Sequence, residues 1–118
     1  MKTGRERRIH PRIDHQLPLN VAFNEHAFTT NTQNLSCLGT YCRIDKYIPP
    51  FTRVRIKLDL PVNNEKHNVE CDGVVVRSED DADGTFDIAI YFNRIQDRSR
   101  QELTDYVSQH VQGAYSQQ

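Results

Sequence analysis

The chain has 118 residues, of which 36% are apolar, and its formal net charge at pH 7 is −1. This length suits one domain with one small core, and a charge so close to zero excludes a general polyanion binder. Three cysteines without close pairing argue against a disulfide framework. No apolar run is long enough for a membrane span or a signal peptide. We therefore expect a cytoplasmic protein.

The first twelve residues form a basic segment. They contain Lys2 and four arginines, but only one acidic residue, Glu6. Pro11 favours an extended backbone at His10 and prevents a regular helix there. We therefore expect residues 1–12 to be a flexible basic arm in front of the folded domain.

Six segments after the arm have the alternation of apolar and polar residues that is typical of half-buried strands. The clearest is residues 53–60, in which four charged residues alternate with four apolar ones. The other segments are residues 17–23, 28–36, 39–45, 69–79 and 85–93. Gly73 inside one of them predicts a bulge or a close approach of another backbone. Short strands at this regular spacing predict an all-β fold, a small antiparallel barrel.

The end of the chain changes to the period of an amphipathic helix. Its apolar face consists of Leu103, Tyr106, Val107, His110 and Val111. Ser99 with Glu102 fits a capping box at the start of this helix, and Asp97 is an alternative start. We expect the barrel and helix over residues 13–112, followed by a disordered tail over residues 113–118.

The motifs of common enzyme classes are missing from the chain. It has no glycine-rich phosphate loop, no HExxH sequence and no supported Ser–His–Asp order, so we expect no catalytic residues. Cys37, Cys42 and Cys71 lack the close spacing of a zinc site, and the five histidines are scattered. We expect neither a metal site nor a cofactor.

Two stretches suggest recognition of an anion or a guanine base. Arginine presents a planar fork that pairs with phosphate or with the O6/N7 edge of guanine, and the arm uses arginines. In "NLSCLG", Asn34 and Ser36 lie two apart, so on a strand they share a face from which oxygens can accept guanine N–H groups. Gly39 would let the backbone approach a flat ligand. Taken singly, the stretches also fit a solvated arm and a polar strand end.

Together the two stretches resemble the signature of the PilZ domain family, RxxxR followed by (D/N)xSxxG. Arg8 and Arg12 match the first part, and Asn34, Ser36 and Gly39 match the second. The later segments "DGVVVR" and "IAIYFNRI" also resemble strands of this family. The resemblance implies a six-stranded antiparallel β-barrel with a C-terminal α-helix that binds the bacterial second messenger cyclic di-GMP.

The resemblance also implies roles for individual residues. Arg8 and Arg12 would hold guanine edges and phosphates, while Asn34 and Ser36 would hydrogen-bond the ligand and Gly39 would keep the loop tight. Position 34 is Asn where many members of the family have Asp, which leaves the affinity open.

Three further positions extend the implied ligand site. Arg7, directly before RxxxR, resembles members that accept a mutually intercalated pair of ligand molecules instead of one. Val75 occupies a strand position at which some members contact a base, and Arg77 lies nearby.

We therefore expect a non-enzymatic cyclic di-GMP receptor whose arm becomes ordered on the ligand and signals to an unidentified protein partner. One alternative is an adaptor protein with the same fold that needs no ligand. A second alternative is a small barrel that binds nucleic acid, against which stand the acidic balance of the remaining chain and the lack of an aromatic stacking row.

Overall fold

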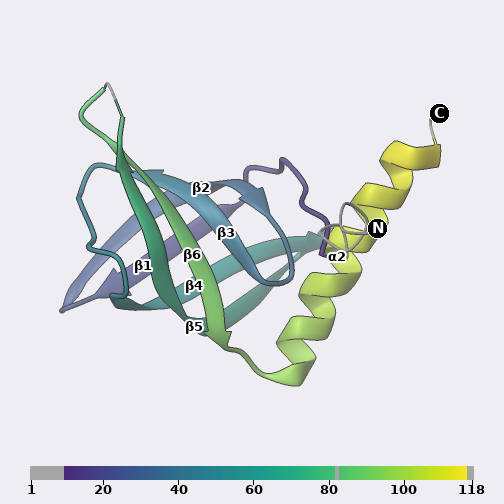
Figure 1. The fold of residues 1–118 in the computed structure, drawn as a ribbon. Helices are drawn as coiled ribbons and strands as arrows, with labels where there is room; N and C mark the ends of the chain where they lie inside the picture. Colours follow the sequence, from purple (N-terminus) through teal and green to yellow (C-terminus); the bar gives the residue numbers. More distant parts are fainter. Residues whose placement is uncertain (1–9, 82, 117–118) are drawn as a thin grey trace, which may run out of the picture.

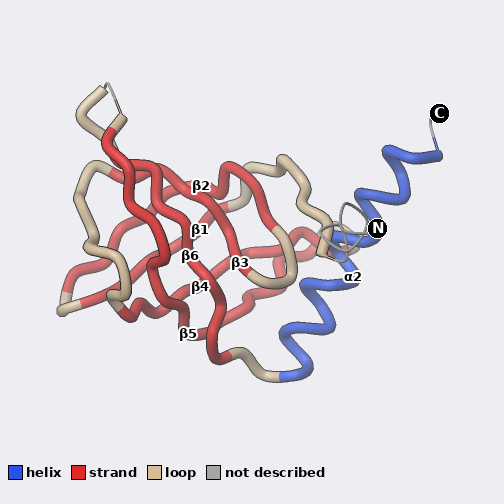
Figure 2. The backbone as a smooth tube through the Cα atoms, in the orientation of Figure 1, coloured by secondary structure: helices blue, strands red, loops and turns tan. Residues whose placement is uncertain are grey.

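The computed structural model describes residues 10–81 and 83–116, so that most of the predicted basic arm lies outside the described residues. The strands form a closed barrel in the order β1-β2-β3-β6-β5-β4, and every neighbouring pair is antiparallel (Figures 1 and 2). The elements are β1 (Pro18–Phe23), β2 (His26–Leu35), β3 (Gly39–Ile44), β4 (Arg53–Val62), β5 (Glu65–Asp80), β6 (Phe86–Arg94) and α2 (Asp97–Ser116). The predicted six-stranded barrel with a C-terminal helix is confirmed.

Alternating residues of the strands fill the barrel. In β4 the four apolar residues predicted to share a face are each at most 4% exposed, and the charged residues between them point outward. Leu19 and Val21 of β1 and Ile88, Ile90 and Phe92 of β6 follow the same rule and are at most 2% exposed. The period-two pattern therefore positions the core as the sequence predicts.

Two hairpins are closed by two-residue turns. Asn24 and Glu25 connect β1 to β2, Asn63 and Asn64 connect β4 to β5, and all four have φ angles between 52° and 68°. Positive φ at both central residues matches the right-handed twist of the flanking strands, and asparagine tolerates it best. Strand β5 begins directly after the second turn, at Glu65, and not at residue 69 as predicted. The prediction started late because the first residues of this strand are polar and show no alternation in the sequence.

Strand β5 is irregular at two places opposite β6. Its register shifts between Asp72 and Gly73, which confirms the bulge predicted at the glycine. A Cβ atom on Gly73 would lie 2.7 Å from Cγ2 of Ile90, so the close approach needs glycine here. A second shift leaves Val76 as an extra residue before Arg77, and both of these side chains are exposed on the outside of the barrel.

Helix α2 lies beside one end of the barrel, and its C-terminal turns project past it (Figure 1). It begins at Asp97, the alternative start, and its Leu103, Tyr106 and Val107 are buried in the core. The helix runs to Ser116, past residue 112, where the folded part was expected to end. A glycine inside a helix costs only about 1 kcal/mol and does not have to end it. No helix in the described part of the chain is long and apolar enough to cross a membrane.

Candidate functional site

A short segment in front of β1 carries Arg12 and is fastened to β2. The backbone N–H and C=O of Ile13 both form hydrogen bonds with Leu35, each 2.9 Å long. The buried hydroxyl of Thr32 donates a hydrogen bond to the carbonyl oxygen of His15. These bonds place Arg12 beside the end of β2, where the predicted NxSxxG motif begins.

The same segment also contacts helix α2. Nδ1 of His15 lies 2.9 Å from the hydroxyl of Tyr106, and the ring of His15 lies edge-on to that of His110 with 4.3 Å between the centroids. Burial lowers the pKa of His15, the neighbouring His110 lowers it further, and Asp14 opposes the effect. The segment that holds Arg12 is thus clamped between β2 and α2.

The loop between β2 and β3 is held tightly to β6. The N–H of Ser36 donates to the carbonyl oxygen of Gly39 at 3.0 Å, and the Ser36 hydroxyl accepts from the N–H of Leu38 at 3.1 Å. The carbonyl oxygen of Leu38 accepts from the N–H of Phe92 at 2.8 Å. A Cβ on Gly39 would overlap the backbone carbonyl of Ile90, so this glycine is required by its approach to β6.

Asn34 has an unpaired oxygen at the end of β2. Its backbone carbonyl accepts a hydrogen bond from the Thr40 hydroxyl at 2.7 Å. Its side-chain Oδ1 is buried and has no hydrogen-bond partner within the described residues. Buried polar atoms are normally paired, so this oxygen lacks the hydrogen bond that its burial calls for.

Three of the five predicted motif residues, Arg12, Ser36 and Gly39, border a cleft of about 350 Å³ on the outer surface of β3, β5 and β6. Its walls consist of His10, Arg12, Ser36, Leu38, Gly39, Thr40, Tyr41, Val76, Arg77, Ala89, Ile90 and Tyr91. The structure therefore brings Arg12, Ser36, Gly39 and Arg77 together. Asn34 lies at the neighbouring strand end but does not line the cleft, and Arg7 and Arg8 lie outside the described residues.

Two arginines of the cleft lie against one aromatic ring. The guanidinium carbon of Arg12 is 5.2 Å from the ring centroid of Tyr41, and that of Arg77 is 5.8 Å from it. Arg77 also donates a hydrogen bond of 2.8 Å to the Tyr41 hydroxyl and lies 3.8 Å from the Glu79 carboxylate. The cleft thus offers two planar cations beside a half-buried aromatic ring.

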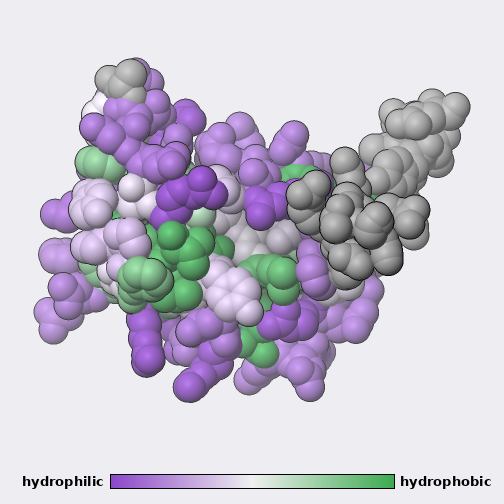
Figure 3. Space-filling model, in the orientation of Figure 1, coloured by the Kyte–Doolittle hydropathy of each residue, from purple (hydrophilic) through white to green (hydrophobic). Residues whose placement is uncertain are grey.

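Val75, which was expected at the ligand site, does not line the cleft. Val75 is 0% exposed and lies in the barrel core, whereas the bulge turns Val76 outward, where it is 50% exposed and lines the cleft. Tyr91 of β6 lines the cleft too and is 45% exposed. Apolar side chains gather on this face of the molecule among polar ones (Figure 3).

The sequence reasoning missed His10, Tyr41, Val76 and Tyr91 as cleft residues. A signal for Tyr41 was present, because it lies two residues after Gly39 on the same strand and therefore on the same face. His10 Nδ1 lies 3.4 Å from the sulfur of Cys37, in the loop that carries Ser36.

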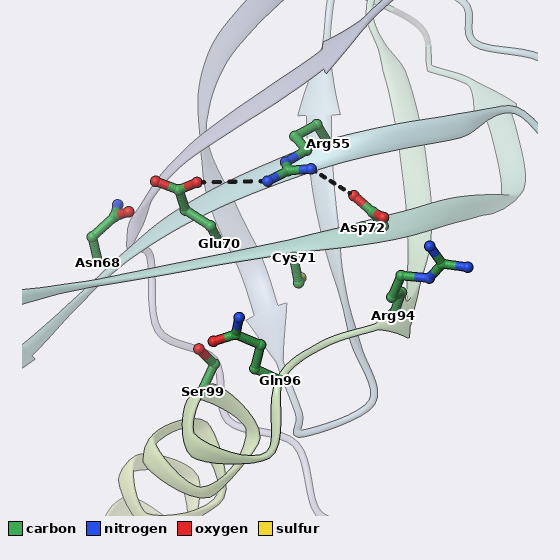
Figure 4. Close-up of a pocket in the computed structure, with 8 residues that line it drawn as sticks. All are labelled: Arg55, Asn68, Glu70, Cys71, Asp72, Arg94, Gln96 and Ser99. Atoms are coloured by element: carbon green, nitrogen blue, oxygen red, sulfur yellow. Dashed lines mark hydrogen bonds and ion pairs between the residues drawn. The ribbon is translucent and has the colours of Figure 1, made fainter.

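A larger hollow, of about 440 Å³, lies between the barrel and the start of α2 (Figure 4). Arg55 lies 3.3 Å from the carboxylate of Asp72 and 3.9 Å from that of Glu70. Its charge is therefore balanced within the chain, and no motif residue lines this hollow. Size alone does not make it the functional site.

The family model of the PilZ domain matches residues 6–109 of this chain. The chain belongs to the PilZ domain family. The match spans both parts of the predicted signature, including the two arginines of RxxxR. No curated protein sequence matches the chain significantly.

Solved structures confirm the PilZ fold. The inhibitor of motility MotI/DgrA from Bacillus subtilis aligns with a TM-score of 0.82 at 19% identity, covering 90% of this chain and 52% of that chain. The PilZ domain of YcgR from Escherichia coli, solved with c-di-GMP, aligns with a TM-score of 0.64 at 13% identity, covering 94% and 96%. PlzA from Borreliella burgdorferi, in complex with c-di-GMP, has a TM-score of 0.58 at 18% identity, covering 90% and 43%. The chain thus spans about half the length of the MotI structure.

Proposed function

We propose that this PilZ domain is a non-enzymatic receptor for cyclic di-GMP. The observation that carries the proposal is the meeting of Arg12 with Ser36 and Gly39 at one cleft, although they are far apart in the sequence. Two structures of similar fold, the PilZ domain of YcgR and PlzA, were solved with c-di-GMP. The family match over residues 6–109 covers the whole proposed site.

Each group of the cleft has a chemical task in this proposal. Arg12, together with Arg8 and Arg7 of the arm, pairs with phosphate oxygens and guanine edges and stacks on the bases. On ligand binding, Asn34 would turn its buried Oδ1 toward the cleft and accept a guanine N–H group, which would supply the hydrogen bond that this oxygen lacks. Ser36 supplies a hydroxyl beside it.

Ligand binding would order the basic arm over the cleft. Ordering such a segment costs about 2–5 kcal/mol of the gross interaction energy, which the arginine contacts must exceed. The ordered arm and the ligand then form a new surface for a downstream protein. Because the ligand favours the ordered state, the signal is a population shift.

The test is isothermal titration of the chain with cyclic di-GMP, with GTP and cyclic GMP as comparison ligands. We expect saturable, selective binding, and a measured stoichiometry of either one molecule or an intercalated pair. Arg8→Ala and Arg12→Ala should each weaken binding by about tenfold to a hundredfold, because each removes a charge-assisted contact worth about 1.5–3 kcal/mol. Arg12→Lys should fail nearly as badly, since a lysine lacks the planar fork.

The matched control is Arg98→Ala, which removes an exposed arginine of α2 that does not line the cleft. Asn34→Asp should strengthen binding, because a carboxylate forms charge-assisted hydrogen bonds with guanine donors. Absence of heat at high ligand concentration would refute the receptor and favour the ligand-independent adaptor. Steeply salt-dependent binding of single-stranded oligonucleotides would instead favour a nucleic-acid-binding barrel.

A further inference from the structure

Tyr41 lies between the two described arginines of the cleft but belongs to neither part of the signature motif. It is on β3, half-buried, and the centroid of its ring lies 5.2 Å from the guanidinium carbon of Arg12 and 5.8 Å from that of Arg77. The two arginines come from distant parts of the chain, the segment before β1 and the bulge of β5. One ring thus contacts both cations.

We infer that Tyr41 is a positioning residue that holds Arg12 and Arg77 over the cleft, so that the ligand clamp includes Arg77 as a further arginine. This inference rests on the proposed function. It extends the site to a residue on β3 and explains the orientation of the exposed Arg77 by its contacts with Tyr41.

The contacts of Arg77 support this role. Its guanidinium donates a hydrogen bond of 2.8 Å to the Tyr41 hydroxyl, and its other terminal nitrogen lies 3.8 Å from the Glu79 carboxylate. The bulge before it brings two consecutive side chains of β5 to the outer surface, so Arg77 points to the cleft and not along the regular alternation. The guanidinium is therefore held in place from two sides.

Arg12 depends on the ring more strongly than Arg77 does. Arg12 is exposed, and no hydrogen bond or ion pair of its side chain is found within the described residues. A long arginine side chain loses rotamer entropy when a ligand fixes it, and contact with a rigid ring removes part of that loss in advance. A guanidinium that already lies on an aromatic face also presents its other face to a purine base.

The experiment is a double-mutant cycle measured by titration with cyclic di-GMP. Tyr41→Leu removes the aromatic face and should weaken binding about five- to thirtyfold, because the ligand must then immobilise two arginine side chains that the ring no longer holds. Tyr41→Phe keeps the face, loses only the hydroxyl and should bind within about threefold of the wild type. In an Arg12→Ala background, Tyr41→Leu should cause a clearly smaller further loss, because one of its two arginines is already gone.

A second measurement reports the geometry without ligand. Side-chain proton signals of Arg12 and Arg77 should show ring-current shifts in nuclear magnetic resonance spectra, and these shifts should vanish in Tyr41→Leu and persist in Tyr41→Phe. Signals of the exposed Arg98 serve as the control. Absence of these shifts in the wild type would show that the ring does not hold the arginines in the free protein, and would overturn the inference.

The outcomes separate the two ideas. Binding by the wild type together with unchanged affinity of Tyr41→Leu would overturn the role of Tyr41 alone. Losses from Tyr41→Leu and Arg12→Ala that simply add would overturn it as well. If the wild type binds no cyclic di-GMP, the proposed function fails, and this role fails with it.

Discussion

Gly39 is the motif residue whose removal should affect the free protein most. In Gly39→Ala the new Cβ would overlap the carbonyl oxygen of Ile90 and lie 3.2 Å from its carbonyl carbon and 3.3 Å from Cα of Tyr91. All three atoms are backbone atoms of β6, so no side-chain rotation relieves the clash. β3 and β6 would have to separate at the point where they carry the cleft.

The expected cost follows from these contacts. Overpacking costs about 1–3 kcal/mol, and separation of the strands there would also weaken the 2.8 Å hydrogen bond from Phe92 to Leu38, worth about 0.5–1.5 kcal/mol. Together they lower the free energy of unfolding by about 1.5–4.5 kcal/mol. For a domain of this size the thermal midpoint should fall by roughly 5–20 °C.

The assay is thermal unfolding of the ligand-free protein, followed by circular dichroism. Gly84→Ala is the matched control, because a Cβ there meets nothing within 4 Å although φ is +80°. It should cost only about 1–2 kcal/mol, from the left-handed backbone conformation alone. A midpoint of Gly39→Ala equal to or above that of Gly84→Ala would refute the reasoning and would leave the glycine with a role only in the bound state.

Three other results follow from the buried groups. Burial raises the pKa of Cys42 and of Cys71 to about 12, so a thiol reagent at about pH 8 should modify Cys37 alone in the folded protein and all three thiols in denaturant. Because burial lowers the pKa of His15 from 6.5, protonation is harder in the folded state, and stability should fall as the pH drops below that value. Leu103→Ala, at a position that is 0% exposed, should lower the free energy of unfolding by about 2–5 kcal/mol.

Each of these results has its own check. Modification of all three thiols at one rate without denaturant would show that the barrel core is open. The acid-dependent fall of the thermal midpoint should be smaller in His15→Gln than in the wild type or in His26→Gln, which changes an exposed histidine. Leu103→Ala should lower the midpoint far more than Gln101→Ala, at an exposed position on the same helix.

The barrel could be predicted from the sequence because its strands alternate regularly. In β4 and β6 the apolar residues all lie on one side of the strand, so only that side can face the core. Gly73 marks the bulge that the structure contains. The family signature also predicted that Arg12 and Ser36 meet, which the structure shows at one cleft. The local sequence pattern was sufficient to predict which face a residue occupies wherever that face follows from its neighbours on the same strand.

The remaining features depend on contacts between distant segments. The bulge that turns Val76 outward is defined only by the register against β6, and the resemblance to the family indicated Val75 instead. The placement of Arg77 on Tyr41 also needs two strands that are not neighbours in the chain. The helix end was placed too early because Gly113 weakens the helical pattern without ending the helix.

Closure of the barrel limits how another protein can bind it. Each strand has a hydrogen-bonded neighbour on both sides, and the part of β5 that extends past β6 is contacted by α2, where Glu102 lies 3.4 Å from His67. Many proteins capture a partner by extending a sheet at a free edge, and here the described strands leave little edge for such pairing. A protein that binds this barrel would therefore have to recognise its side chains and surface shape, because few backbone groups of the described strands are free to pair with it.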